Sequence, residues 1–167
     1  MSNKQIFLTL LLGQLFSWLG IFLGENLNAP YIFPFLFGIS VPLANWNSVN
    51  YKKWRSTLTL GLISTALFFG SAILAVGLGN VHLIISFAAV GLSGIGFLLF
   101  NSAFISSIQV NYLTGTVTFV LVAISLPIGK EVLQLIDRQD TIYLLLFSTF
   151  MTTLGLCSSK LTAEQMN

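Results

Sequence analysis

The side chains of this sequence that could do chemistry are mainly uncharged amides and hydroxyls, set within or between long apolar runs. Such groups donate and accept hydrogen bonds without carrying a charge, and uncharged pores hold neutral solutes in this way. Inside a membrane the same groups also join neighbouring helices. We therefore take five residues as candidate contacts to a solute or between helices: Gln14, Ser17, Asn101, Gln109 and Asn111. The amides of Gln14, Asn101 and Gln109 are expected to point into the protein, because an unpartnered amide is costly in hydrocarbon.

The sequence offers little for catalysis or metal binding. It contains one histidine, His82, and one cysteine, Cys157, so the chain cannot form an internal disulfide or a cysteine metal cluster. No zinc-protease, nucleophile-elbow or phosphate-loop motif occurs. Glu131, Asp137 and Asp140 could bind a hard cation, but carboxylates on a surface turn are normally only solvated. We expect a protein that is not an enzyme and that holds no cofactor or metal.

The composition indicates a protein that lies in a membrane. Of the 167 residues, 55% are hydrophobic and only 7% are charged, whereas a soluble domain carries roughly 25% charged residues. A surface with so few charges cannot mostly face water, so the lipid bilayer is the expected partner. The net charge of +2 provides no basic surface for nucleic acid, and no nucleic-acid partner is expected.

Six apolar runs are expected to cross a bilayer, for which an α-helix needs about 20 residues, although the apolar core of the second run has only about 13. The sequence therefore predicts an all-α integral membrane protein, a single domain over residues 1–167 built as a bundle of six transmembrane helices. The expected helices cover residues 5–24, 31–49, 57–77, 83–102, 112–128 and 141–159. The turn between the fourth and the fifth falls somewhere in the polar stretch 101–113.

Prolines shape two of these segments. Pro34 and Pro42 interrupt the second run, and each removes a backbone donor, so we predict a kinked helix there, with a re-entrant segment as the alternative. Pro127 and Gly129 are expected to end the fifth helix. The residues that follow, 130–140, have the spacing of a short amphipathic helix on the membrane surface.

Small residues recur along the first run at steps of three and four. They are Gly13, Ser17, Gly20 and Gly24. At this spacing they share one face of a helix, and small side chains on one face let a second helix approach closely in lipid. The pattern predicts that this face packs against other helices.

The stretch 45–56 is expected to fix the topology. It holds three of the seven basic residues, Lys52, Lys53 and Arg55, together with aromatic residues. Short basic loops remain cytoplasmic, and Trp and Tyr favour the headgroup layer. With six spans, both termini are then cytoplasmic, and the expected location is the plasma (inner) membrane. If the second run were re-entrant, the sides after it would exchange.

Two classes of function remain open. The first is a channel or transporter component for a small neutral solute, lined by hydroxyls and amides. The second is an accessory or assembly subunit of a larger membrane complex without a solute pathway, in which the small-residue faces pack against other membrane subunits or a second copy of the chain. No charged residue lies well inside an expected span, which argues against proton relays and voltage sensing.

Overall fold

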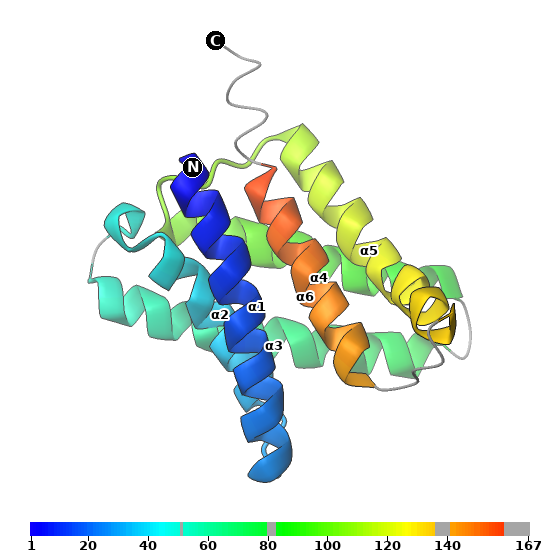
Figure 1. The fold of residues 1–167 in the computed structure, drawn as a ribbon. Coiled ribbons are helices and arrows are strands. Elements are labelled where there is room, and N and C mark those ends of the chain that lie inside the picture. The colour runs from blue at the N-terminus through cyan, green and yellow to red at the C-terminus, as the bar shows by residue number, and fades with distance from the viewer. Residues whose placement is uncertain (51, 80–82, 136–140, 159–167) are drawn as a thin grey trace.

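The computed structural model describes residues 1–50, 52–79, 83–135 and 141–158, and these are helical almost throughout (Figure 1). A short 3₁₀ helix, η1 (Trp46–Ser48), follows the second of the α-helices. The six α-helices are α1 (Asn3–Asn26), α2 (Ile32–Ala44), α3 (Lys53–Gly79), α4 (Leu83–Phe104), α5 (Tyr112–Leu135) and α6 (Thr141–Cys157). The all-helical prediction is therefore confirmed for the described residues.

The second predicted helix is shorter than expected. α2 has 13 residues and ends at Ala44 rather than at residue 49, which makes it about 20 Å long, against about 30 Å for the hydrocarbon core of a bilayer. Pro34 lies in its first turn, where backbone N–H groups have no intrahelical partner, and Pro42 lies in its last turn. Both prolines therefore stand near an end of the helix.

The predicted end of the fifth helix is wrong. α5 continues through Pro127 and Gly129 to Leu135. One proline removes one backbone hydrogen bond, and helices in membranes keep such residues when neighbouring groups satisfy the freed carbonyl. Residues 130–135 therefore extend α5 and do not begin a separate surface helix. The rest of that predicted helix, residues 136–140, lies outside the described residues.

The helices form a closed ring of neighbours. Each helix packs on the next one in the chain, and α6 returns to pack on α1. The axes are not parallel, because α3 and α4 run across the direction of α1 and α6 (Figure 1). The ring leaves a partly open hollow that every helix except α1 helps to line.

α1 carries its small residues inward and its large apolar residues outward. The predicted thin face is confirmed, since Gly13, Ser17, Gly20 and Gly24 are all buried. A Cβ placed on Gly20 would lie 2.6 Å from the Cα of Phe33 on α2, so only glycine permits this approach. The exposed residues of the same helix include Phe7, Leu11, Leu15, Trp18 and Phe22.

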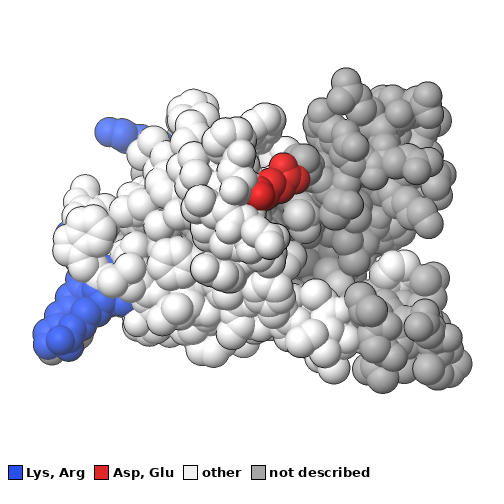
Figure 2. All heavy atoms as spheres, turned by 90° about the horizontal axis from the view of Figure 1, so that it is seen from below, with Lys and Arg blue, Asp and Glu red and all other residues white. Residues whose placement is uncertain are grey.

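Three helical segments are long and apolar enough to cross a membrane: Asn3–Asn26, Lys53–Leu74 and Phe87–Phe104. Only 28%, 22% and 33% of the residues in their most apolar windows are buried, so most of this apolar surface faces outward. Figure 2 shows a broad, mostly uncharged surface, with Lys and Arg side chains at its left edge and acidic atoms near its centre. Such a surface is compatible with a membrane location. Three shorter apolar helices are Ile32–Ala44, Tyr112–Ser125 and Leu145–Cys157.

At one end of the molecule, backbone hydrogen bonds join two of the segments that connect helices. The clasp, as we call it, consists of Met1, residues 45–50 and residues 104–108. Its central bond runs from the N–H of Asn50 to the carbonyl oxygen of Phe104, 2.8 Å. Further bonds join Ser106 to Ser48, 2.9 Å, and the N-terminal amine of Met1 to the carbonyl oxygen of Ser107, 3.1 Å. The clasp thus ties the α2–α3 connection to the α4–α5 connection and to the N-terminus.

Candidate functional site

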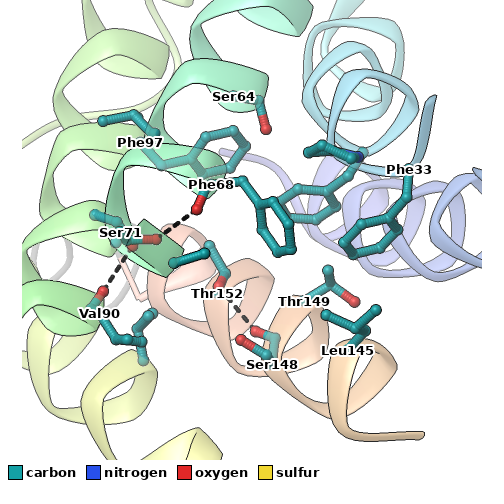
Figure 3. A pocket seen from close by; sticks show the side chains of 17 residues that line it. Phe33, Ser64, Phe68, Ser71, Val90, Phe97, Leu145, Ser148, Thr149 and Thr152 are labelled. Atoms are coloured by element: carbon teal, nitrogen blue, oxygen red, sulfur yellow. Dashed lines mark hydrogen bonds between the residues drawn. The ribbon is translucent and has the colours of Figure 1, made fainter. Parts of the chain in front are cut away.

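A cavity of about 410 Å³ lies inside the ring (Figure 3). This volume falls in the range of about 300–1,000 Å³ typical of small-molecule sites. It is lined by residues of α2, α3, α4, α5 and α6, most of them apolar. The lining is Phe33, Pro34, Phe37, Ser64, Leu67, Phe68, Ser71, Ala72, Val90, Ser93, Gly94, Phe97, Val122, Leu145, Ser148, Thr149 and Thr152.

Phenylalanine rings from three helices make up one wall of the cavity. Phe37 of α2 and Phe97 of α4 stack with ring centres 5.0 Å apart and an interplanar angle of 21°. Phe33 of α2 meets Phe68 of α3 edge to face, with centres 5.4 Å apart. Aromatic pairs in these arrangements contribute about 0.5–1.5 kcal/mol beyond their buried area. The wall presents ring faces and edges that suit another ring.

Serine and threonine hydroxyls supply the polar part of the lining. Four of them already donate to a backbone carbonyl oxygen of their own helix, at 2.7–2.9 Å; these are Ser71, Ser93, Thr149 and Thr152. A hydroxyl whose proton is engaged in this way offers only its lone pairs to a ligand. A fifth, Ser148, accepts a hydrogen bond from the hydroxyl of Ser125, 3.3 Å.

Ser64 is the exception among the cavity hydroxyls. It points from α3 into the cavity (Figure 3), is only 4% exposed, and makes no hydrogen bond within the described part of the chain. Its position is fixed by a tight crossing of α2 and α3. A Cβ on Gly38 would lie 2.5 Å from the Cβ of Ser64 and 2.8 Å from the carbonyl oxygen of Leu60. The backbones meet here without room for a side chain at residue 38.

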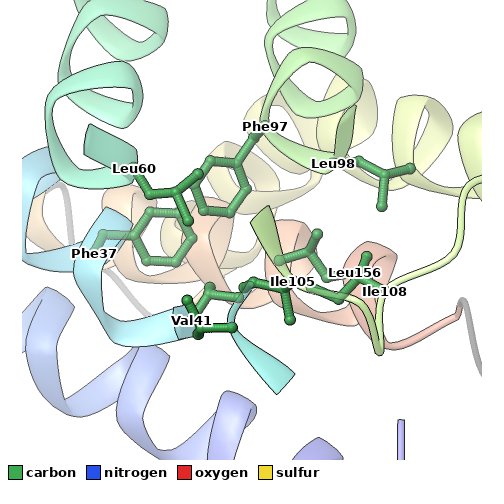
Figure 4. Packing of buried hydrophobic residues seen from close by; sticks show 9 residues of the cluster. Phe37, Val41, Leu60, Phe97, Leu98, Ile105, Ile108 and Leu156 are labelled. Atoms are coloured by element: carbon green, nitrogen blue, oxygen red, sulfur yellow. The ribbon is translucent and has the colours of Figure 1, made fainter. Parts of the chain in front are cut away.

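The cavity is closed toward the clasp by a core of buried apolar residues (Figure 4). The core includes Val41, Leu60, Leu98 and Leu156, each 0% exposed. It also includes Phe37 and Phe97, which line the cavity as well, together with Val49, Ile105 and Ile108. The cavity itself lies nearer the beginnings of α2 and α6, which are at the opposite end of the molecule.

The lining contains no acidic or basic side chain. Among the described residues there is also no group of three His, Cys, Asp or Glu side chains that could hold a metal ion. Burying an unpaired charge in such surroundings is strongly unfavourable. The cavity is therefore suited to binding a neutral molecule through ring contacts and a few hydrogen bonds.

None of the five residues predicted as polar contacts lines the cavity. Gln14 of α1 comes nearest, because its amide nitrogen donates to the hydroxyl of Thr149, a lining residue of α6, at 3.4 Å. Ser17 is buried and donates to the carbonyl oxygen of Gly13 at 2.6 Å. Gln14 thus joins two helices, and Ser17 bonds within its own helix.

The other three predicted residues lie near the clasp. Asn101 is fully buried and donates to the carbonyl oxygen of Phe97 at 2.8 Å, while its own carbonyl oxygen is without a partner. Asn111 caps α5, since its side-chain oxygen accepts from the N–H of Thr114 at 2.8 Å. Gln109 is exposed, so the expectation that it points into the protein is wrong. It lies in the connection before α5, where the amide reaches the surface.

The basic residues gather around tryptophan rings. Lys53 and Arg55 stand in the first turns of α3, immediately after Lys52, and the ammonium group of Lys53 lies 5.6 Å from the ring centre of Trp46. Trp46 and Trp54 meet edge to face, with centres 4.9 Å apart. Cations at a helix N-terminus oppose the helix dipole. Their placement therefore does not serve helix stability.

The spacing of serine and phenylalanine in the sequence could have indicated the cavity residues, which the search for amides did not find. Ser64, Phe68 and Ser71 recur at steps of four and three on α3, and Ser93 and Phe97 are four apart on α4. A helix face that mixes phenylalanine with serine is neither a plain lipid face nor a plain small-residue seam. It could have indicated an amphipathic cavity wall.

Searches against protein-family models, characterised proteins and solved structures find no match to this chain.

Proposed function

We propose that the protein is an integral membrane protein, with both termini cytoplasmic in a plasma membrane, that binds a small neutral solute in its central cavity. It acts as a channel or transporter component and not as an enzyme. The observation that carries the proposal is the cavity of about 410 Å³, walled by phenylalanine and lined by uncharged hydroxyls. A rigid apolar pocket with a few convergent polar groups is the usual form of a small-molecule site.

The outward apolar surface supports the membrane part of the proposal. Leucine and phenylalanine side chains on the outer face of α1 would be unfavourable in water, whereas its glycines and serine are buried. In a water-soluble helix the large apolar residues face inward. The reversed pattern fits a helix whose outer face contacts lipid.

The position of the cavity supports access from one side. The clasp and the apolar core close the end that carries Met1 and the basic residues 52–55. If that end is cytoplasmic, as its charges favour, the cavity lies toward the outer side. The protein would then capture its solute from outside or from the outer leaflet.

The proposal is tested by filling the cavity. Ser93→Phe places a ring in the cavity, and the control Leu92→Phe places one at the neighbouring position of α4, where Leu92 is 60% exposed. The measurement is native mass spectrometry of the full-length protein, purified in mild detergent, for neutral molecules that co-purify. We expect a bound mass on the wild type and on Leu92→Phe, and its loss from Ser93→Phe.

A bound mass that is retained by Ser93→Phe would contradict the proposal, as would a wild type without any bound neutral molecule. In the second case the remaining class is a subunit of a larger complex. Its expected signature is a partner protein that co-purifies with wild type and with both variants alike.

A further inference from the structure

The geometry points to Ser64 as the residue that determines which solute is bound. We propose that the ligand is an uncharged, ring-containing molecule with a hydrogen-bond acceptor, such as a ketone, placed against the Ser64 hydroxyl. This inference rests on the proposed function, because it names the substrate class of the same cavity. It is carried by the Ser64 hydroxyl, which faces the cavity and makes no hydrogen bond among the described residues, whereas the hydroxyls of Ser71 and Ser93 beside it are engaged.

The Ser64 hydroxyl is placed to receive a partner in the cavity. The residue is more than nine-tenths buried and has no hydrogen-bond partner among the described residues. A ligand acceptor that reaches the hydroxyl forms a hydrogen bond there without breaking one within the protein. Sites built around an unpaired polar group discriminate strongly, because an analogue without the matching group leaves it unpaired again.

The neighbouring hydroxyls do not compete for the same role. The protons of Ser71 and Ser93 are engaged by carbonyl oxygens of their own helices. Those hydroxyls can accept from a ligand but cannot donate to one without giving up a backbone bond. Among the lining hydroxyls of α3 and α4, Ser64 is therefore the one that can donate to a ligand without giving up a bond to its own helix.

The ring preference follows from the surroundings of Ser64. Phe68 is one turn further along α3, and Phe37 projects from α2, which crosses α3 at Gly38 and Ser64. A planar ligand can stack on, or meet edge to face, the rings that line this wall. A charged ligand is disfavoured because the lining has no counter-charge.

The tight crossing makes Ser64 a dependable contact. Gly38 brings the backbone of α2 against α3, so the Cα and Cβ of Ser64 are held in place beside the cavity. Hydrogen-bond recognition depends on such fixed positions. On the other side of the cavity, the amide of Gln14 on α1 bonds the hydroxyl of the lining residue Thr149 on α6.

The test uses two probes of matched shape, 2-acetylnaphthalene and 2-ethylnaphthalene, which differ in a carbonyl group. Binding to the detergent-purified full-length protein is measured by the ligand-induced shift of the thermal unfolding midpoint over a concentration series. For the wild type we expect the ketone to bind more tightly. In Ser64→Ala the ketone should lose about fivefold in affinity, while the hydrocarbon changes less than about twofold. Thr65→Val removes a hydroxyl of α3 that bonds the carbonyl oxygen of Gly61 and does not line the cavity, so it is the control and should leave the preference intact.

Ser64→Cys, whose thiol is a weak donor, should give a smaller loss of the same kind and serves if Ser64→Ala does not fold. An unchanged preference for the ketone in both Ser64 variants would overturn the proposal, and so would an equal loss for both probes. If neither probe binds the wild type, the ligand class is wrong. The cavity proposal is then decided separately, by whether Ser93→Phe loses the co-purified molecule.

Discussion

Two buried asparagines show how differently one residue type can be used. Asn45, at the end of α2, donates to the hydroxyl of Thr9 at 3.0 Å and accepts from the hydroxyl of Ser107 at 3.4 Å. It therefore joins α1, α2 and the α4–α5 connection. Asn101 bonds only within α4, and its buried carbonyl oxygen has no partner. The first stabilises tertiary structure, whereas the second carries a desolvation cost.

We therefore expect Asn45 to contribute more to the free energy of unfolding than Asn101. Asn45→Ala should lower the free energy of unfolding by about 1–3 kcal/mol, because it leaves the Thr9 and Ser107 groups without their partner. Asn101→Ala should lower it by less than about 1 kcal/mol, since the loss of one hydrogen bond within α4 is offset by the removal of an orphaned oxygen. Unfolding in a denaturing-detergent titration measures both. Equal losses would show that the contacts of Asn45 do not contribute.

The sequence identified amides as polar contacts but not the cavity. An amide is rare in an apolar run, so the sequence predicts that it needs a hydrogen-bond partner. The bond from Gln14 to Thr149 of α6 meets this need. Serine and threonine are common in such runs and can satisfy themselves on their own helix, as Ser17 does. Which hydroxyls face the cavity depends on how five helices pack, and periodicity within one segment does not contain that information.

At the scale of elements, boundaries were predictable where composition changes sharply. The fourth and sixth helices begin at Leu83 and Thr141, as expected from the apolar runs. The errors fall at prolines and glycines. A proline ends a helix only if the freed carbonyl lacks another partner, and that depends on neighbours. Pro127 thus stands inside α5, although the local pattern indicated an end.

Glycines on the same kind of helix should respond in opposite ways. Gly20→Ala places a Cβ 2.6 Å from the backbone of Phe33 and should force α1 and α2 apart. Gly70→Ala on α3 places one where no atom lies within 4 Å, so it should stabilise by about 0.5–1 kcal/mol through helix propensity. Thermal unfolding in mild detergent compares the two. A Gly20→Ala midpoint at or above that of the wild type would refute the packing argument.

At the scale of the whole molecule, the fold brings together segments from distant parts of the chain at one end. In the sequence, charge was the only feature that placed these segments on the same side. The topology predicted from Lys52, Lys53 and Arg55 puts the N-terminus on the same side as these residues, and in the structure Met1 bonds the α4–α5 connection, which in turn bonds residues 48–50 just before them. The tie itself was not predictable, because residues 45–50 and 104–108 pair through backbone groups. Such bonds depend on the placement of helices and carry no side-chain signature.

If the protein spans a membrane as proposed, the side on which the clasp lies decides from where the cavity can be reached, and a labelling experiment measures it. Gln109 is exposed next to the clasp and Glu25 is exposed at the end of α1, on the opposite side of the helix ring. In a background with Cys157→Ser, we expect Glu25→Cys to react with a membrane-impermeant maleimide on intact cells. Gln109→Cys should react only after permeabilisation, because basic connections stay cytoplasmic.

This pattern would place the core of Phe37, Phe97 and Leu60 between the cavity and the cytoplasm. A solute entering from outside would then meet a closed floor, and its release inward would require the Phe37 and Phe97 stack to open. Labelling of Gln109→Cys on intact cells, with Glu25→Cys protected, would reverse the orientation. The cavity would then face the cytoplasm, and a role in capture from outside would be ruled out while neutral-solute binding would still stand.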